Sequence, residues 1–558
     1  MLVEQATAHQ THKVENQPPP LENYNAFKQD AGLCEALHRE GADWAEERVC
    51  AFGALTGSEH VIALGHQANK NPPLLKTHDR FGHRVDEVEF HPAWHELMRI
   101  GIGAGVHALP WSEPRRGAHV ARAALGYLLS QAESGVGCPL TMTFAGVPAL
   151  RQQPEIADEW VPRLITANYD PRFIPAAEKN GALIGMAMTE KQGGSDVRAN
   201  STRARAVSSG GPGEEYALVG HKWFCSAPMC DAFLTLAQTD AGVSCFIVPR
   251  WLPDGTRNPF RIQRLKDKLG NCSNASSEIE YVDTQARMVG EDGRGVPTII
   301  EMVNHTRLDC VMGSAALMRQ AFAQAAHHAT YRSAFGRRLL SQPLMQNVLA
   351  DLAIESEAAT QLMMRLARTY DEAASDPSRR PFARIATAVS KYWVCKRTPG
   401  LVGEALECHG GNGYVEESIL PRLFREAPLN SIWEGSGNVM CLDVLRAMTR
   451  EPDSLDAFLA HLDSTVGKDP RVDRHIAQLK NDLADPQNAE YRARRVVEQM
   501  ALALQASILV ETADASLVDA FCASRLEGAG GHVYGTLPAG TPFEKIIERA
   551  RPKLDGEP

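Results

Sequence analysis

The chain has 558 residues, of which 44% are hydrophobic and 23% charged, a composition typical of an ordinary globular protein with several domains. Its formal net charge of -10 argues against bulk electrostatic attachment to nucleic acid, although a local basic face would be compatible with that charge. The 12 cysteines include no C-x-x-C pair, so we expect neither a metal site nor a disulfide framework.

The amino-terminal segment predicts no export or membrane anchoring. Its sequence, MLVEQATAHQTHKVENQPPP, lacks the charged start and apolar centre of a secretory signal. No stretch of the chain reaches the roughly 18 consecutive apolar residues that a membrane-spanning helix needs. We therefore expect a cytoplasmic protein without membrane contact.

Hydrophobic periodicity divides the chain into four parts and predicts an α+β multidomain fold. Apolar residues recur at helical spacing in residues 1–180, which predicts a helical domain. Residues 181–294 change to short β-type runs between Gly, Asp, Asn and Pro clusters, which indicates a small β domain. Long helical patterns return in residues 295–450 as a bundle, and residues 451–558 continue as an appended helical module.

Three segments could carry chemistry. In residues 186–196 an apolar strand opens into a glycine pair followed by Ser195, which suits phosphate binding but also an ordinary turn. In residues 221–226, Trp223 could stack on a flat ring beside the Ser226 hydroxyl, or could simply be a core residue. In residues 430–440, Glu434 could be a partly desolvated general base or an exposed residue favoured by the helix dipole.

Ordered motifs decide between these alternatives, because the chain resembles the acyl-CoA dehydrogenase superfamily. The motifs are Met188-Thr189-Glu190, Gly194-Ser195-Asp196, Lys222-Trp223, Lys268-Leu269-Gly270, Val289-Gly290, Arg332-x-x-Phe335-Gly336, Gly410-Gly411-Asn412-Gly413-Tyr414 and Trp433-Glu434-Gly435-Ser436. The resemblance implies a helical N-terminal domain, a middle flavin-binding β-barrel and a helical bundle that carries a catalytic loop.

Within the superfamily, the chain is most similar to the branch of bacterial adaptive-response (alkylation-response) flavoproteins, over nearly its whole length. This closer resemblance rests on Thr11-His12-x-Val14-x-Asn16-Gln17-Pro18, on Phe90-His91-Pro92-Ala93-Trp94-His95 and on residues 189–196 and 430–446.

The resemblance implies bound FAD and assigns its contacts. The implied cofactor-binding residues are Met186, Met188, Thr189, Gly194, Ser195, Trp223, Phe224, Cys225, Ser226, Arg332, Ile432, Trp433, Gly435, Ser436, Gly437 and Asn438. Among them, Ser195 is expected near the pyrophosphate, and Arg332 is expected to reach the flavin pyrophosphate of a neighbouring subunit, which implies a homotetramer. The chain departs from the family pattern at Cys225, at Gln342-Pro343 and at Glu407.

The general base of the family has two known positions. The second position lies near residue 306, where this chain has Asn304-His305-Thr306-Arg307 and no carboxylate. Glu434 is therefore the only candidate. It would remove the α-proton of an acyl-CoA thioester while the β-hydrogen leaves as hydride to flavin N5.

Three functions remain open at this point. The chain is expected to be an FAD-dependent acyl-CoA dehydrogenase acting in the response to DNA alkylation damage. Alternatively, it is a protective flavoprotein that binds double-stranded DNA without significant acyl-CoA turnover, or it is a purely metabolic dehydrogenase. Residues 451–558, implicated in DNA contact in this branch, hold 12 Lys and Arg against 18 Asp and Glu, which weakens the DNA prediction.

Overall fold

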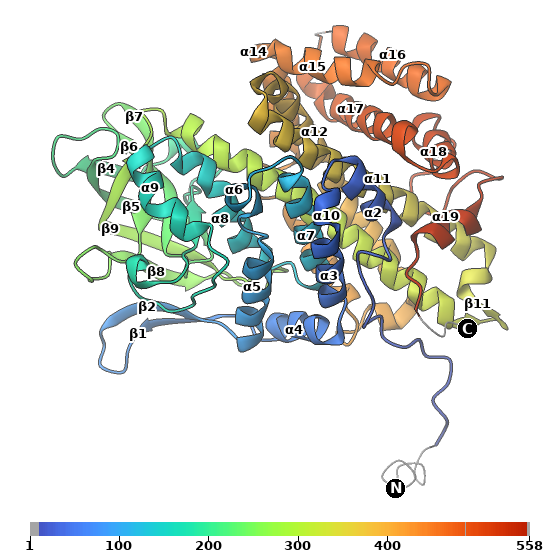
Figure 1. The fold of residues 1–558 in the computed structure, drawn as a ribbon, viewed down its shortest axis with the longest axis horizontal. Helices are drawn as coiled ribbons and strands as arrows, with labels where there is room; N and C mark the ends of the chain where they lie inside the picture. Colours follow the sequence, from blue (N-terminus) through green and yellow to red (C-terminus); the bar gives the residue numbers. More distant parts are fainter. Residues whose placement is uncertain (1–10, 486, 555–558) are drawn as a thin grey trace.

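The structure is a computed structural model that describes residues 11–485 and 487–554. Figure 1 shows a β-rich part at one side, helices through the centre and a further helical layer formed by the end of the chain. The predicted order of parts is confirmed: a helical N-terminal part precedes a β domain and a helical C-terminal part. Residues 1–10, part of the expected leaderless terminus, lie outside the described residues.

The N-terminal part is built from helices that pack around one buried helix. These helices are α2 (Ala31–Arg39), α3 (Glu46–Thr56), α4 (Glu59–Lys70), α5 (Pro92–Ala104), α6 (Leu109–Ser112), α7 (Ala118–Ala132), α8 (Gly137–Leu150) and α9 (Pro154–Leu164). Every residue of α7 is buried. Even the charged Arg122 of this helix is buried, in an ion pair with Asp309, so α7 forms the centre of this part.

A β-hairpin interrupts these helices where the sequence predicted only helix. Strands β1 (Leu74–His78) and β2 (Arg84–Glu89) pair antiparallel, and the hairpin projects from the body of the molecule in Figure 1. The Asp79 carboxylate accepts hydrogen bonds from the Phe81 and His83 amides, which forms the turn. Most side chains of both strands are exposed or half-buried, so the hairpin lacks the apolar face by which a strand is usually predicted.

The β part is a closed barrel. Its strands are β3 (Ile184–Ala187), β4 (Arg203–Ala206), β5 (Glu215–Ser226), β6 (Ala232–Thr239), β7 (Gly242–Pro249), β8 (Phe260–Leu265) and β9 (Ser276–Val289). The strand order is β3-β6-β4-β5-β9-β7, and an additional pairing of β6 with β7 closes the path. Closure removes most free strand edges. The long strand β5 ends at Ser226, so the barrel delivers residues 222–226 to one rim.

The bundle continues from the barrel. Its helices are α10 (Gly295–Tyr331), α11 (Pro343–Ser375), α12 (Arg380–Glu407), α13 (Leu420–Glu426) and α14 (Gly437–Arg450). Helix α10 contacts β7 as well as α7, α8, α11 and α12, so it joins the barrel to both helical parts. A short hairpin of β10 (Ser333–Ala334) and β11 (Arg337–Arg338) separates α10 from α11.

The final residues form a helical extension. It comprises α15 (Pro452–Asp463), α16 (Pro470–Ala484), α17 (Ala489–Thr512), α18 (Ala515–Phe521), the π-helical turn η9 (Cys522–Leu526) and α19 (Phe543–Ala550). Helix α17 packs on α14, α12 and α11 of the bundle. Within the described residues, we find no helix that is both long and apolar enough to cross a membrane.

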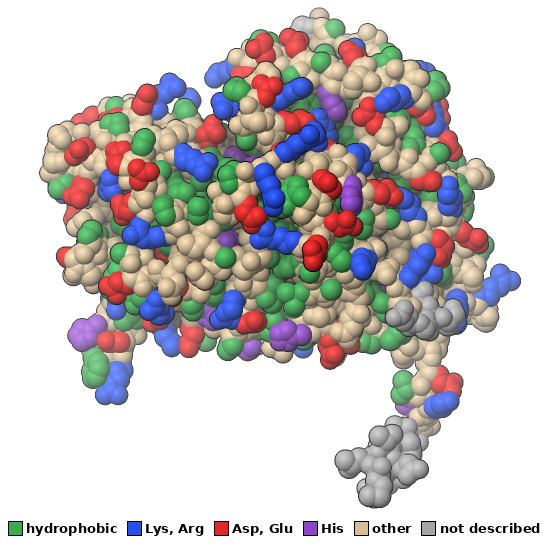
Figure 2. Space-filling view, in the orientation of Figure 1, with side chains coloured by type: hydrophobic (Ala, Val, Ile, Leu, Met, Phe, Trp, Pro, Cys, Tyr) green, Lys and Arg blue, Asp and Glu red, His purple; other side chains and the backbone are tan. Residues whose placement is uncertain are grey.

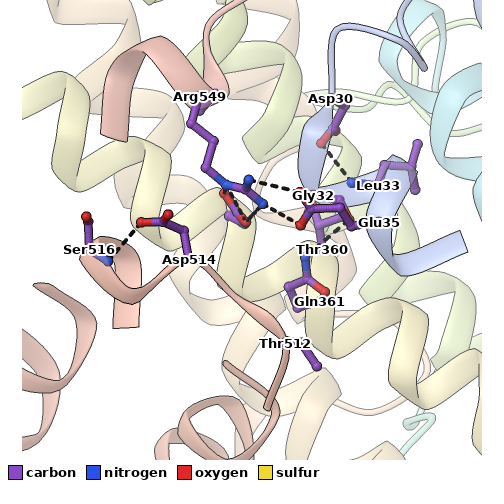
Figure 3. A network of polar contacts seen from close by, with 12 residues as sticks. Asp30, Gly32, Leu33, Glu35, Thr360, Gln361, Thr512, Asp514, Ser516 and Arg549 are labelled. Carbon is purple, nitrogen blue, oxygen red and sulfur yellow. Dashed lines mark hydrogen bonds and ion pairs between the residues drawn. The ribbon is translucent and has the colours of Figure 1, made fainter. Parts of the chain in front are cut away.

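The end of the chain returns to its beginning. Figure 3 shows Arg549 of α19 pointing toward Glu35 of α2. The Arg549 guanidinium donates to both Glu35 carboxylate oxygens at 3.0 and 2.6 Å and to the buried Glu357 of α11 at 2.8 Å. Among the described residues, one arginine thereby joins the first helix, the bundle and the last helix.

Candidate functional site

The segment after β3 folds back on itself beside Thr189. A Cβ atom on Gly194 would lie 2.4 Å from Thr189 Oγ1, so only glycine allows this close approach. Gly193 has φ +152°, and a Cβ built there would meet nothing within 4 Å. Gly194 therefore packs directly against the Thr189 side chain, and the open space of this segment lies at Gly193. Ser195 follows with its side chain exposed, while Met186 and Met188 lie half-buried at the end of the strand.

Two contacts join this segment to the end of β5. The Trp223 amide donates to the Thr189 carbonyl at 2.7 Å. The Glu190 carboxylate lies 2.8 Å from the Lys222 ammonium, and both side chains are fully buried. Burial alone would raise the pKa of Glu190, but the charge and hydrogen bond of Lys222 hold that pKa well below its usual range. The pair fixes two of the predicted cofactor segments side by side.

The end of β5 presents a mixture of exposed and buried side chains. Trp223 and Ser226 are half-buried and Phe224 is 49% exposed. Lys266 Nζ lies 3.2 Å from the centre of the Trp223 ring, so a cation covers one face of the indole. The Cys225 side chain, by contrast, is completely buried in the barrel. Any contact from Cys225 to a bound group would therefore involve its backbone.

The loop before α14 carries Glu434 in an unusual backbone conformation. Glu434 has φ +56° and Gly435 has φ +102°. The ammonium of Lys391, a residue that is 1% exposed, donates to the carbonyls of Asn430 and Gly435 at 3.0 and 2.7 Å. Trp433 Nε1 donates to Asn430 Oδ1 at 2.9 Å. These hydrogen bonds fix both ends of the loop, and together they stabilise the strained left-handed conformation of Glu434.

The Glu434 carboxylate has one close donor. Thr306 Oγ1 donates to Glu434 Oε2 at 2.7 Å, and Arg307 Nε donates to the Glu434 carbonyl at 3.1 Å. Among the described residues, no group donates to Glu434 Oε1. Burial raises the pKa of Glu434, while the Thr306 hydrogen bond and the charges of Lys391 and Arg307 lower it in part. A desolvated carboxylate with a free oxygen is a good proton acceptor.

Cys138 connects the barrel rim to this loop. Burial raises the pKa of the Cys138 thiol to about 12, and the thiol also responds to the charges of Lys268 and Glu434 and to a Ser226 hydrogen bond. Cys138 is therefore near enough to both the predicted ring-binding segment and the predicted base to interact with them electrostatically. The sequence analysis missed this residue, since a lone cysteine at the start of α8 carries no signal of its own.

Other predicted residues lie elsewhere or make different contacts. Arg332 Nη1 donates to the Asn16 carbonyl of its own chain at 2.6 Å. Ile432 is 64% exposed, and Ser436 is also exposed. Asn438 Oδ1 accepts a hydrogen bond of 2.8 Å from Arg494 of α17, a residue that the sequence did not suggest for this site. The predicted contact of Arg332 with a neighbouring subunit stays a prediction.

Comparisons with known families agree with this architecture along the chain. Residues 16–171 match the family model described as the adaptive response protein AidB N-terminal domain. Residues 185–284 and 293–449 match the models of the acyl-CoA dehydrogenase middle and C-terminal domains. The chain therefore belongs to the acyl-CoA dehydrogenase family, a family of FAD-dependent oxidoreductases.

Individual relatives are similar over most of the chain. It is 47% identical to the AidB protein of Escherichia coli strain K12, over 94% of this chain and 96% of that protein. The crystal structure of Caenorhabditis elegans ACDH-11 in complex with C11-CoA is 27% identical, covers 94% of both chains and has a TM-score of 0.85. A Bacillus anthracis acyl-CoA dehydrogenase complexed with FAD shares the fold, with 19% identity, coverage of 82% and 80%, and a TM-score of 0.61.

The side chains at the barrel rim have the hydrogen-bond donors and the aromatic surface that FAD binding requires. The barrel rim offers hydroxyls at Thr189 and Ser226, the half-buried indole of Trp223 and the open space at Gly193. Hydroxyls and backbone amides suit a flavin and its phosphates, and an indole suits a flat ring. The assignment of these particular residues to the cofactor remains a proposal.

Proposed function

We propose that this chain is an FAD-dependent acyl-CoA dehydrogenase in which Glu434 is the general base. One observation carries this proposal: a donor engages only Oε2 of the half-buried Glu434 carboxylate, and burial raises the pKa of that group. The barrel segment around Thr189, Trp223 and Ser226 would hold the flavin across Cys138 from this carboxylate. The C11-CoA ligand of ACDH-11 supports an acyl-CoA thioester as the substrate class.

In the proposed dehydrogenation, the Glu434 side chain and the Glu434 backbone amide have different roles. Glu434 Oε1 removes the α-proton of the acyl group, so the α C–H bond breaks and the proton resides on the carboxylate. FAD, when bound, supplies the acceptor of the hydride that leaves the β-carbon. The Glu434 backbone amide would donate to the thioester carbonyl, where negative charge develops as the proton leaves. Lys391 and Arg307 hold the loop that carries both groups.

Anaerobic bleaching of the flavin tests this function. The purified holoprotein is mixed without oxygen with a panel of acyl-CoA thioesters of different chain length, including a C11 thioester. We expect loss of the oxidised flavin absorbance with at least one thioester. If every thioester leaves the wild-type flavin oxidised, the dehydrogenase proposal is wrong. A colourless protein that cannot take up FAD would contradict the cofactor assignment as well.

We also propose that the chain assembles as a homotetramer. The β10–β11 hairpin supports this proposal, since Phe335 at its tip is 98% exposed and Arg332 precedes it. Large exposed apolar side chains are often interface residues. Sedimentation equilibrium on wild type and on Phe335→Ser measures the assembly. A wild-type monomer would exclude the tetramer.

A second proposed function is contact with double-stranded DNA in the response to alkylation damage. The observation that favours it is a cavity of about 610 Å³ in the extension, lined in part by Arg471, Arg474, Arg495 and Arg525. Lys and Arg neutralise phosphates in sequence-independent DNA binding. Three of these arginines already pair with acids: Arg471 with Asp469 and Asp519, Arg474 with Glu527, and Arg525 with Asp351 and Glu355.

The lining of the cavity selects the arginines for the DNA test. Arg492, which pairs with Asp485, and Arg494, which bonds Asn438, do not line the cavity. On the face drawn in Figure 2, basic and acidic side chains are interspersed. We expect duplex affinity to fall on the order of a thousandfold between roughly 50 and 200 mM salt, if six or more phosphates are contacted. Replacing Arg471, Arg474 and Arg495 by Gln should abolish binding, with Arg492→Gln as the control. No duplex binding at the lower salt would reject this role.

A further inference from the structure

The loop between β8 and β9 carries a buried side-chain amide, that of Asn274. The residue is 1% exposed, and neither Oδ1 nor Nδ2 makes a hydrogen bond within the described part of the chain. Nearly all buried polar side-chain atoms in proteins have a partner, because an unpaired one loses its bonds to water without compensation. The donor and the acceptor of this amide are therefore both available to a bound molecule.

The backbone around Asn274 is held on both sides. Its N–H donates to the Asn271 carbonyl at 3.2 Å, and its carbonyl accepts from Lys268 Nζ at 2.5 Å. The next carbonyl, that of Ala275, accepts from the Ala227 amide at 2.8 Å. Ala227 directly follows β5, so these bonds tie the loop to the barrel rim that is proposed to bind the flavin.

Cys138 relates the Asn274 amide to the proposed catalytic groups. Burial raises the pKa of the Cys138 thiol, and the Asn274 amide and the Ser226 hydroxyl lie close enough to lower it in part. The charge of Glu434 acts on the same thiol. A thiol is a weak hydrogen-bond partner and does not satisfy an amide. In the proposed reaction the acyl group contacts Glu434 through its α-carbon and the flavin through its β-carbon, so Asn274 is near the position of the acyl group.

Helix α8 adds a second polar side chain on the side of Cys138. Thr141 follows Cys138 by three residues, so the two share one face of the helix, and Thr141 is half-buried. Its hydroxyl donates to Asp309 Oδ2 at 2.5 Å, and Asp309 is itself paired with the buried Arg122. An amide and a hydroxyl around the acyl position suit a chain with a polar group better than a plain alkyl chain.

From the unpartnered amide of Asn274 and its place beside Cys138 and Ser226, we propose that Asn274 binds a neutral hydrogen-bonding group, a hydroxyl or an amide, on the acyl chain of the substrate. The inference rests on the proposed dehydrogenase function and narrows its substrate class. The polar group lies beyond the β-carbon, because the α- and β-carbons are the two that the reaction oxidises. A hydroxyl or an amide can both accept from Nδ2 and donate to Oδ1.

The charges around the amide favour a neutral group over a carboxylate. The Glu434 carboxylate would repel a second carboxylate on the substrate. Lys268 Nζ is the nearby cation, and it already donates to the Asn274 carbonyl and to Ser276 Oγ at 3.1 Å. The substrate therefore needs no charge on its acyl chain.

The test compares γ-hydroxybutanoyl-CoA with pentanoyl-CoA, in which a methyl group replaces the hydroxyl. Anaerobic flavin reduction is followed in the wild-type holoprotein and in Asn274→Leu, which keeps the size of the side chain without its polar atoms. Asn274→Ala, which adds no bulk, is measured alongside, so that a folding defect of the leucine variant leaves the alanine variant to decide. Gln131→Met is the matched control, because Gln131 of α7 is also buried and its Nε2 is also unpartnered.

We expect the wild type to prefer the hydroxylated thioester by about tenfold or more. Asn274→Leu and Asn274→Ala should lower reduction by that thioester by about tenfold to a hundredfold, the range for one hydrogen bond lost with its partner left buried. Reduction by pentanoyl-CoA should stay unchanged, and Gln131→Met should keep the wild-type preference.

Four results would overturn the inference. They are equal reduction of the wild type by the two thioesters, equal losses with both thioesters in the Asn274 variants, weaker FAD binding in those variants with unchanged preference, and a stronger response of the wild type to succinyl-CoA than to γ-hydroxybutanoyl-CoA. The third result would assign the amide to the cofactor. If neither thioester reduces the wild-type flavin, it is the dehydrogenase proposal that loses support, and calorimetric affinities for the two thioesters then decide. A preference for the hydroxyl that both Asn274 variants lose would support the binding role, and equal affinities would overturn it.

Discussion

The Glu190 carboxylate and the Lys222 ammonium form an ion pair of 2.8 Å in which neither side chain is exposed to solvent. Lys222 also donates to the Leu236 carbonyl at 2.8 Å, and Glu190 accepts from Ser201 and Thr202. The pair holds the Thr189 segment against the end of β5. Loss of either partner therefore affects both the stability of the barrel and the cofactor site.

We expect Lys222→Met to lower the free energy of unfolding by about 3–5 kcal/mol, because it leaves the Glu190 carboxylate buried without its counter-charge. Urea denaturation measures this loss. Lys191→Met is the matched control, since Lys191 is the exposed neighbour of Glu190. The pair Glu190→Gln and Lys222→Met should be more stable than Lys222→Met alone. A Lys222→Met protein as stable as wild type would contradict the assignment.

The same pair predicts a pH dependence. The folded-state pKa of Glu190 lies below its unfolded value of about 4.3, so the pair contributes stability above that pH. The contribution is lost as the pH falls below about 4.3 and the carboxylate is protonated on unfolding. Denaturation curves between roughly pH 3 and pH 7 should show this loss in wild type. In the double variant, which lacks both charges, this part of the dependence should disappear.

Thr306→Val tests the donor to the general base. The hydroxyl lowers the pKa of Glu434, so its removal should raise the pH at which flavin reduction is half-maximal. Thr306→Ser keeps a hydroxyl and should behave like wild type. The measurement is the pH profile of single-turnover reduction. An unshifted profile in Thr306→Val would show that the hydroxyl does not influence the base.

Glu434→Gln should retain FAD and slow flavin reduction by roughly 100-fold to 10,000-fold, since the amide cannot accept the α-proton. The variant should also be more stable than wild type near pH 7. Because the folded-state pKa of Glu434 is raised, the wild type loses stability as the pH rises above about 4.3 and the desolvated carboxylate ionises. Stopped-flow reduction and thermal melting measure the two effects. Unchanged reduction kinetics would exclude Glu434 as the base, and Glu417→Gln on the surface is the control.

Lys391→Met removes the ammonium that holds both ends of the Glu434 loop. Two carbonyls lose their donor, at a cost of about 1–3 kcal/mol for each group left buried without a partner. We expect faster amide exchange in residues 430–436 and a higher pKa for the base, since a nearby positive charge is lost. Exchange measured by mass spectrometry and the pH profile check both. If the role of Lys391 were purely structural, Lys391→Met would change the amide exchange rates and leave the pH profile of flavin reduction unchanged.

The sequence predicts the fold class because the apolar period changes clearly at the barrel. The continuous apolar runs of β6 and β7 become buried strands, and the long helical patterns after residue 295 become α10, α11 and α12. The β1–β2 hairpin was missed because its strands, LLKTH and RVDEVE, do not alternate regularly between apolar and polar residues, and most of their side chains are exposed or half-buried. Strands are predicted from the alternation of apolar and polar residues that one buried face produces, and these two strands have no such face.

The candidate site shows a similar limit. Glu434, Trp223 and Ser195 could be predicted because their motifs are local. The bond from Thr306 to Glu434 spans 128 residues, and the bond from Arg494 to Asn438 spans 56. Such contacts depend on how helices pack, which no local pattern encodes. Position 306 attracted notice only for lacking a carboxylate, whereas its hydroxyl is what contacts the base.

The contact of Arg549 with Glu35 has a consequence for synthesis of the chain. The two residues are 514 positions apart, so at roughly 5–20 residues per second the ribosome makes α19 about half a minute to about 100 s after α2. Throughout that interval Glu35 and Glu357 lack the guanidinium of Arg549 as a partner. The contact of α2 with α19 can therefore form only after the last helix has left the ribosome, when the rest of the chain has already been made.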